Sequence, residues 1–161
     1  MFSAGILATT VDTSPKYTLG SIHFQSTSAG TKGYMYVQAS GAITGDSYVV
    51  DIDGSAFTAV LSTTTTTAPG TGAGKPVGVA RVALASGEYG FVQIYGAGTV
   101  RVAASAAAYT LLNSTATAGQ IDDDATAGAE VIDGITLDAA NGGAAGAVAA
   151  FINFPKVGRT L

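Results

Sequence analysis

The sequence predicts an all-β protein: a small β-barrel or sandwich with an extended N-terminal arm and long Thr/Gly-rich and Asp-rich loops. Thr, Val, Gly, Tyr and Ser are abundant, and these residues favour strands and turns over helices. Short apolar runs recur with Gly, Asn, Asp or Pro between them, a spacing typical of all-β domains. Some runs alternate between two faces, as in residues 34–39, where Tyr34, Tyr36 and Gln38 share one side.

The chain of 161 residues is long enough for one domain with a buried core. We expect an arm at residues 1–18 and a single β-rich domain at 19–161. Only 11% of the residues are charged, against about 25% in an ordinary soluble domain. A surface of neutral small residues is typical of a protein that packs against other protein.

The apolar runs predict nine strands, at residues 20–25, 32–39, 47–52, 56–63, 77–84, 90–95, 99–103, 129–137 and 147–154. Gly96-Ala97-Gly98 separates two of them and predicts a hairpin over residues 91–102. The alanine-rich segment 103–112 is the one candidate helix, although Ser105 and its β-branched flanks weaken it.

Three segments do not resemble packed strands. Residues 1–18 hold isolated apolar side chains among Thr, Ser, Asp and Pro, and predict an extended arm. The Thr- and Gly-rich stretch 63–75 predicts an exposed loop, or an edge strand that runs into one. Residues 113–128 are rich in Thr, Ala and Asp, with Ile121 as the one large apolar residue, and predict a long surface loop.

An internal repeat relates two parts of the second half. A shift of 56 residues superimposes 78–92 on 134–148, with matches that include Gly78/Gly134, Ala83/Ala139 and Gly87/Gly143. Both copies have the pattern of a strand, a turn of small residues and a second strand. The repeat therefore predicts two related hairpins within one barrel.

Charge and composition argue against several functions. The net charge is -4 and the seven basic residues are scattered, so we expect no nucleic-acid binding. No apolar run approaches the roughly 18 residues of a membrane span, so we expect no membrane partner. Cysteine is absent, which excludes a disulfide framework and thiol chemistry.

No set of residues has the pattern of an active site or of a cofactor site. His23 is the single histidine and has no neighbouring nucleophile or second ligand, so a structural role is expected. The glycines at 70–74 lack the spacing of a phosphate-binding loop. We assign no catalytic, cofactor-binding or metal-binding residue and expect no enzymatic activity.

Two acidic clusters leave a cation site open as an alternative. Asp51 and Asp53 share one face at a strand end, where a turn at Asp53-Gly54 is the simpler explanation. The second cluster is the run Asp122-Asp123-Asp124, and such a run of like charges usually only keeps a flexible loop in contact with solvent. Neither stretch has the length or the closing Glu of an EF-hand loop.

Tyrosine offers an alternative role in ligand binding, because aromatic faces stack on sugar rings. Such a platform would draw on six tyrosines: Tyr34, Tyr36, Tyr48, Tyr89, Tyr95 and Tyr109. Tyrosine is also common in cores and at subunit contacts, which is the favoured interpretation.

Several passages of small and apolar residues resemble the capsid decoration, or cement, proteins of tailed bacteriophages. They are 76–80 (PVGVA), 85–96 (ASGEYGFVQIYG), 99–103 (TVRVA), 131–137 (VIDGITL) and 142–143 (GG). The similarity covers about 80 residues and includes no catalytic signature. The Thr-rich stretch 63–67 has no counterpart in that group.

The resemblance implies a non-enzymatic structural protein of the virion. It would be made in the host cytoplasm, bind the outside of the capsid, bridge major capsid protein subunits and form a homo-oligomer, with a trimer as the leading expectation. We expect the capsid contact to involve the large apolar residues of the arm, Phe2, Ile6, Leu7 and Val11. The alternative function is a carbohydrate- or receptor-binding β-domain of a virion or bacterial surface.

Overall fold

The computed structural model describes residues 6–124 and 126–161, and it confirms the all-β prediction. In chain order its elements are β1 (Ile22–Thr27), β2 (Gly30–Ala39), β3 (Val49–Ile52), β4 (Thr58–Leu61), α1 (Thr64–Thr67), β5 (Val77–Ala80), β6 (Tyr89–Val102), β7 (Asn113–Ser114), β8 (Ile121–Asp122), β9 (Glu130–Leu137) and β10 (Gly146–Thr160). No helix within the described ranges is long and apolar enough to cross a membrane.

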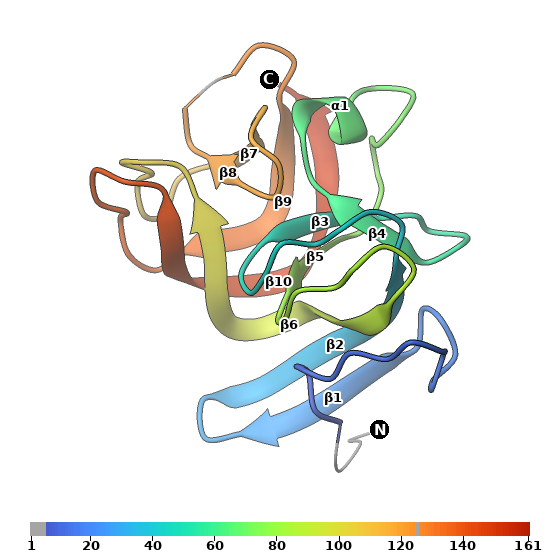
Figure 1. Ribbon diagram of the computed structural model, residues 1–161. Coiled ribbons are helices and arrows are strands. Elements are labelled where there is room, and N and C mark those ends of the chain that lie inside the picture. Colours follow the sequence, from blue (N-terminus) through green and yellow to red (C-terminus); the bar gives the residue numbers. More distant parts are fainter. Residues whose placement is uncertain (1–5, 125) are drawn as a thin grey trace.

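The strand pairings close two small barrels that share β6 (Figure 1). The first barrel runs from β2 through β4, β3 and β5 to β6, which pairs back with β2. The second runs from β6 through β10, β9 and β7 to β8, which returns to β6 through the pair Val102–Ile121. β1 adds to the outer side of β2.

Each barrel has its own apolar core. Val37, Val50, Ile52, Ala80 and Val92 belong to the first, and their positions on alternate strand residues place them on the inward face. The second core includes Val100, Val102, Ile121, Leu137 and Ile152. β3 and β5 contribute to both cores, and for this reason all their residues are buried.

β6 is one strand of 14 residues, so the predicted hairpin over residues 91–102 is wrong. Gly96, with φ +95°, bends the strand without reversing it: residues 89–95 pair with β2, and residues 95–102 pair with β10. The Gln93 side-chain amide donates to the carbonyl oxygens of Tyr95, Gly96 and Ala97 at 3.0–3.1 Å and stabilises the bend.

The helix predicted at residues 103–112 does not form. Ser105 and Tyr109 have positive φ, which interrupts a helix. The backbone hydrogen bonds of the segment go to β8, to β9 and to the loop before β10, where Ser105 N donates to Gly142 O at 2.7 Å and Ala106 O accepts from Asn141 N at 2.8 Å. These long-range bonds outweigh the helix propensity of alanine.

The stretch at residues 63–75, predicted to be a loop or an edge strand, contains the helical turn α1. Thr63 and Thr66 form a reciprocal capping box at its start. The Thr66 hydroxyl also donates to Asp51 on β3, and the hydroxyls of Thr67 and Ser114 lie 2.9 Å apart. The threonine run is therefore held by side-chain hydrogen bonds to both barrels.

Residues 113–128, predicted to be a surface loop, contain β7 and β8 and complete the second barrel. Ile121 is fully buried, which accounts for the one large apolar residue in the segment. The Asn113 side-chain amide donates to Asp124 O at 3.1 Å and holds the acidic turn against β7.

The two copies of the repeat both form a strand, a loop and an antiparallel strand, but they lie in different barrels. β5 and β6 belong to the first copy, and β9 and β10 to the second. Val79 pairs with Gln93, whereas Ile135 pairs with Ile152, three residues beyond the position that the 56-residue shift requires. The prediction of two hairpins within one barrel is corrected accordingly.

Candidate functional site

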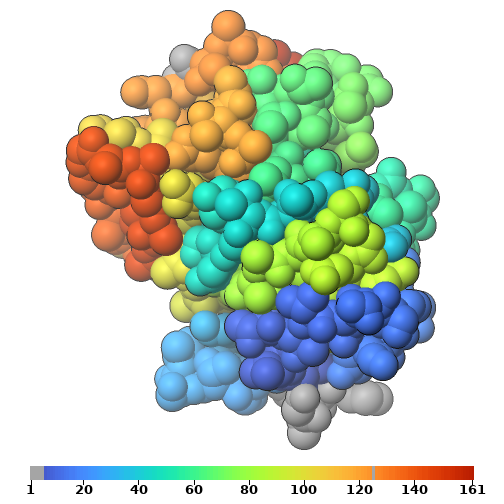
Figure 2. All heavy atoms as spheres, in the orientation of Figure 1, coloured from blue at the N-terminus to red at the C-terminus, as the bar shows by residue number. Residues whose placement is uncertain are grey.

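The arm, from residue 6 onward, lies against the domain (Figure 2, dark blue). Of the four predicted contact residues, Phe2 lies outside the described residues. Ile6 is buried against Tyr34, Tyr36 and Phe91 on the outer face of β2 and β6. Leu7 and Val11 are 65% and 38% exposed, so the structure presents these two to solvent.

Asp12 anchors the arm. Its backbone forms a reciprocal pair with Tyr89 at the start of β6, with both N···O distances 2.9 Å. Its carboxylate Oδ2 accepts a hydrogen bond from the Tyr36 hydroxyl at 2.7 Å, and the same hydroxyl accepts one from Lys16 N at 3.1 Å. Burial raises the pKa of Tyr36 to about 12, which keeps this hydroxyl a donor at physiological pH.

A hollow of about 130 Å³ lies at the arm, lined by Leu7, Thr10, Asp12, Lys16, Tyr17 and Phe91. Tyr17 is 39% exposed and packs edge-on against Tyr36, with ring centroids 5.2 Å apart. We call the exposed apolar side chains Leu7, Val11 and Tyr17 the arm surface. They are attached to a segment whose backbone is already bonded to the barrel.

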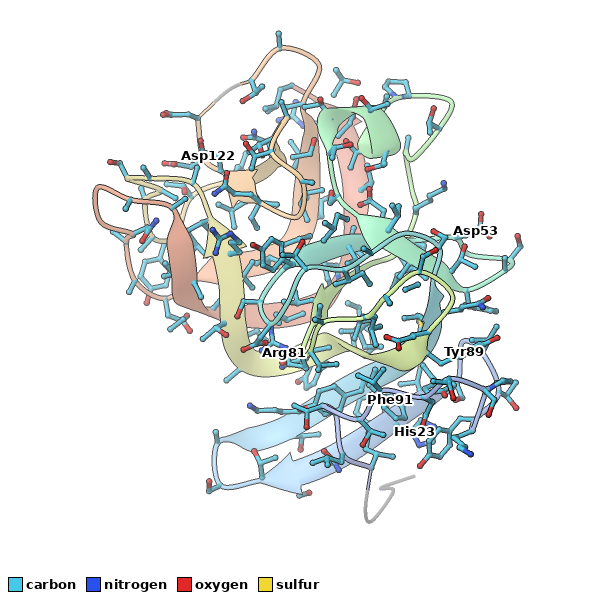
Figure 3. All side chains as sticks on the ribbon, in the orientation of Figure 1. His23, Asp53, Arg81, Tyr89, Phe91 and Asp122 are labelled. Carbon is cyan, nitrogen blue, oxygen red and sulfur yellow. The ribbon has the colours of Figure 1, made fainter. Side chains whose placement is uncertain are left out.

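His23 lies among aromatic rings, close to Phe91 (Figure 3). Its ring centroid is 5.1 Å from that of Tyr17 and 5.4 Å from that of Phe91, and its Nε2 is 3.1 Å from the Ser21 hydroxyl. Within residues 6–124 and 126–161, no group of three or more His, Asp or Glu side chains could hold a metal ion. These contacts describe a packing residue.

Asp51 and Asp53 line one polar hollow of about 170 Å³, together with Thr66 and Lys75. Asp51 is 2% exposed, and burial raises the pKa of its carboxyl, although the Thr66 and Ser62 hydroxyls oppose the shift. Asp53 is partly exposed, and its Oδ1 accepts hydrogen bonds from Ala56 N, Ser55 Oγ and Ser55 N. These bonds lower the pKa of Asp53 to about 2.

One oxygen of each carboxylate is held by the protein, whereas Asp51 Oδ1 is buried without a hydrogen-bond partner among the described residues. Asp51 joins β3 to α1, and Asp53 orders the turn before β4. Lys75 in the same hollow adds a positive charge, which disfavours a cation there.

The acidic run at 122–124 lies elsewhere on the molecule, as the labels Asp53 and Asp122 show in Figure 3. Asp122 Oδ1 accepts a hydrogen bond from Asp123 N at 2.9 Å. Partial burial raises the pKa of Asp122. These contacts fit an acidic turn that is ordered by its own backbone.

The tyrosine platform, which was the alternative interpretation, is not assembled as a surface. Tyr34 and Tyr36 are 5% and 0% exposed and pack under the arm. Tyr48 stacks instead beneath the Arg101 guanidinium, 4.9 Å from the ring centre. Tyr109 is 74% exposed on the loop after β6.

Sequence reasoning missed a different aromatic group, which we call the aromatic patch: Phe24, Tyr95, Phe151 and Phe154. The Tyr95 centroid lies 5.7 Å from that of Phe151 and 5.4 Å from that of Phe154, and Phe24 packs on both Tyr95 and Phe154 at 6.4 Å. Phe151 and Phe154 are 42% and 50% exposed. Three separate strands contribute these rings, so no local pattern indicates the patch.

An apolar pocket of about 300 Å³ adjoins the aromatic patch. Its lining includes Ile22, Met35, Val77, Ile94 and Phe154. The pocket lies where β1, β2, β5, β6 and β10 meet, and its residues Met35 and Ile94 also belong to the core of the first barrel.

Comparison with known proteins gives no match: no family model, no curated protein and no solved structure is similar to this chain.

Proposed function

We propose that the protein is a non-enzymatic capsid decoration protein of a tailed bacteriophage. It binds the outside of the shell as a homo-oligomer and stabilises it by bridging major capsid protein subunits. The observation that carries the proposal beyond the sequence resemblance is the arm surface. Leu7, 65% exposed, and Val11, 38% exposed, are displayed on a segment whose neighbours Ile6 and Asp12 are fixed to the barrel.

This arrangement supports binding with a small ordering cost. A mobile segment loses roughly 1–2 kcal/mol per residue when it becomes ordered. Residues 6–18 already have backbone and side-chain bonds to β2 and β6, so the arm surface is organised before a partner arrives. Each exposed large side chain then contributes up to about 1.5–3 kcal/mol on full burial.

Weak contacts of this kind are sufficient on a symmetric shell. Each capsid subunit repeats the same site, and a homo-oligomer that engages several sites at once gains affinity through effective concentration. The sparse charge of the chain fits a contact made by apolar and neutral side chains. In this role the protein needs no cofactor and performs no chemistry.

The alternative, a carbohydrate- or receptor-binding domain, would use exposed aromatic faces. Burial of Tyr34 and Tyr36 removes two of the six tyrosines from consideration as a stacking surface. Binding to glycans without binding to capsids would favour this alternative.

The first test is whether the gene of this chain lies beside that of a major capsid protein, and the second is cosedimentation with capsids assembled from that protein. We expect the double variant Leu7→Ser/Val11→Ser to lose at least about tenfold in affinity, equivalent to about 1.4 kcal/mol. The matched control is Leu111→Ser, since Leu111 is 64% exposed on a different loop. Absence of binding by the unmodified chain, or equal binding by the double variant, would contradict the proposal.

Truncation of residues 2–12 is a less specific test, because it removes Ile6 and Asp12 from the fold as well. The double serine variant keeps both anchors. Its thermal unfolding should match that of the unmodified chain, so a loss of capsid binding reports on the contact alone.

A further inference from the structure

β1 is the one strand among the described residues that has a neighbour on only one side. Every other strand pairs with two or more strands, because both barrels are closed. β1 pairs with β2 through six consecutive residue pairs, from Ile22–Met35 to Thr27–Gly30, without a bulge. Along its second edge, the backbone N–H and C=O groups have no strand partner within residues 6–124 and 126–161.

This edge lacks the usual protection. Native proteins guard open edges with Lys or other charges, with Pro, with bulges or with a covering loop. The sequence of β1, IHFQST, contains no Lys, Arg, Asp, Glu or Pro. Six residues are also long enough to form a regular pairing with another strand.

The two faces of β1 differ. His23 faces the aromatic side chains under the arm, and Gln25 donates to Ile6 O on that same side. Ile22 and Phe24 lie on the opposite face, where Ile22 lines the apolar pocket and Phe24 belongs to the aromatic patch. Ile22 is 45% exposed, so this apolar face continues to the open edge.

We propose that β1 of one copy pairs antiparallel with β1 of a second copy about a two-fold axis. Antiparallel pairing is self-complementary, since each strand offers the same groups to its partner. The two-fold axis is perpendicular to the sheet, so equivalent faces of the two copies lie on the same side. The two aromatic patches and apolar pockets would then adjoin, with Ile22 and Phe24 forming cross-strand apolar pairs.

The occupant is a second copy because the edge is neutral and its apolar face is self-complementary. No charged side chain on β1 meets its own symmetry mate, so self-pairing involves no like-charge repulsion on the strand. The pairing joins the sheets of the two copies through β1, so that neither β1 keeps an open edge. The inference does not depend on attachment to a capsid.

Sedimentation velocity over about 1–100 µM tests the proposal, a range suited to weak interfaces. We expect a concentration-dependent dimer. Ile22→Lys and Ile22→Glu should each weaken it at least about tenfold, because the two-fold axis brings like charges together. An equimolar mixture of the two variants should restore the dimer, which a folding defect would not do.

Leu111→Lys is the matched control, because Leu111 is an apolar side chain that is 64% exposed on the loop after β6 and belongs neither to β1 nor to the aromatic patch. It should leave the dimer unchanged. Cysteine substitutions provide a second measurement, since the chain has none of its own. Of single cysteine substitutions at each residue from 22 to 27, the variant closest to the axis should form a disulfide-linked dimer under mild oxidation.

Four outcomes would overturn the inference. They are a monomer at every concentration, a dimer or trimer that Ile22→Lys leaves intact, a failure of the mixed variants to reassociate, and an absence of disulfide-linked dimer from every cysteine variant of the series. A monomer whose Ile22 variants lose capsid binding would instead show that the edge accepts a strand of another protein.

Discussion

The Tyr36 hydroxyl donates a hydrogen bond to Asp12 Oδ2 at 2.7 Å and so connects the middle of β2 to the N-terminal arm. Tyr36 is fully buried, and its ring packs against Phe91 with centroids 4.9 Å apart. The bond therefore attaches the arm to the rigid wall shared by β2 and β6. Residues 6–18 are part of the fold through this contact and the Asp12–Tyr89 backbone pair.

Replacement of Tyr36 by Phe should loosen the arm. The change removes the bonds to Asp12 and to Lys16 N but keeps the ring, so the free energy of unfolding should fall by about 1–3 kcal/mol. Denaturant titration measures the loss, and hydrogen exchange should show faster exchange of the Lys16 amide. Tyr109→Phe is the control, because that ring is 74% exposed. Equal effects of the two substitutions would show that the hydroxyl does not anchor the arm.

Asp51 and Asp53 should give opposite dependences of stability on acid pH. Burial raises the pKa of Asp51 above 3.8, so the folded state holds its proton more tightly than the unfolded state. The free energy of unfolding therefore decreases as the pH rises from about 4 through the folded pKa. Asp51→Asn removes this decrease and keeps an acceptor for Thr66, so at pH 7 the variant should be at least as stable as the unmodified chain.

Asp53 behaves in the reverse sense because its hydrogen bonds lower its pKa to about 2. Its stabilisation is present above about pH 4 and is lost as the pH falls towards 2. Asp53→Asn should therefore destabilise the chain at pH 7 and reduce the fall in the free energy of unfolding between about pH 4 and pH 2. Denaturant titrations of both variants between pH 2 and 7 measure the two slopes. A marked destabilisation by Asp51→Asn at pH 7 would mean that the Thr66 and Ser62 hydroxyls outweigh burial.

Alanine at three glycines should separate backbone strain from steric clash. At Gly142 the φ is unexceptional and an added Cβ meets nothing, so little change is expected. At Gly87, with φ +90° and open space, strain alone should cost about 1 kcal/mol. At Gly96, with φ +95°, a Cβ would approach Thr31 O to 2.3 Å, and the loss should exceed that at Gly87 by at least about 1 kcal/mol.

Thermal or chemical unfolding of the three variants provides the comparison. The order Gly142, Gly87, Gly96 is the expected order of increasing loss. If Gly96→Ala were as stable as Gly87→Ala, the close approach of β6 to Thr31 would not be a fixed feature of the first barrel.

The class of the fold could be predicted from local sequence. Alternation along residues 34–39 and the short apolar runs determine strands, because a strand with one buried face needs that period whatever its partners are. The apolar runs predicted as strands correspond to β2, β3, β5, β9 and most of β10 in the structure. Gly-rich segments likewise predict the loops between these strands.

The site was only partly predictable. Leu7 and Val11 are exposed, as a contact role requires. Ile6 is an equally apolar side chain in the same segment, yet it is buried against Tyr34 and Tyr36. The aromatic patch was missed, since Phe24, Tyr95, Phe151 and Phe154 come from three strands far apart in the chain. A single sequence contains no periodicity that relates such residues.

Tertiary structure alone decided how the segments pair. Residues 103–112 are rich in alanine, but their backbone forms hydrogen bonds with distant residues such as Asn141 and Gly142. Gly96 bends β6, although the local Gly-Ala-Gly pattern predicts a hairpin turn. The threonine run becomes helical because its hydroxyls form hydrogen bonds outside the run: Asp51 accepts one from Thr66, and Ser114 forms one with Thr67. Local propensities amount to less than about 1 kcal/mol per residue, whereas closure of two barrels through β6 satisfies many backbone hydrogen bonds and buries two cores at once.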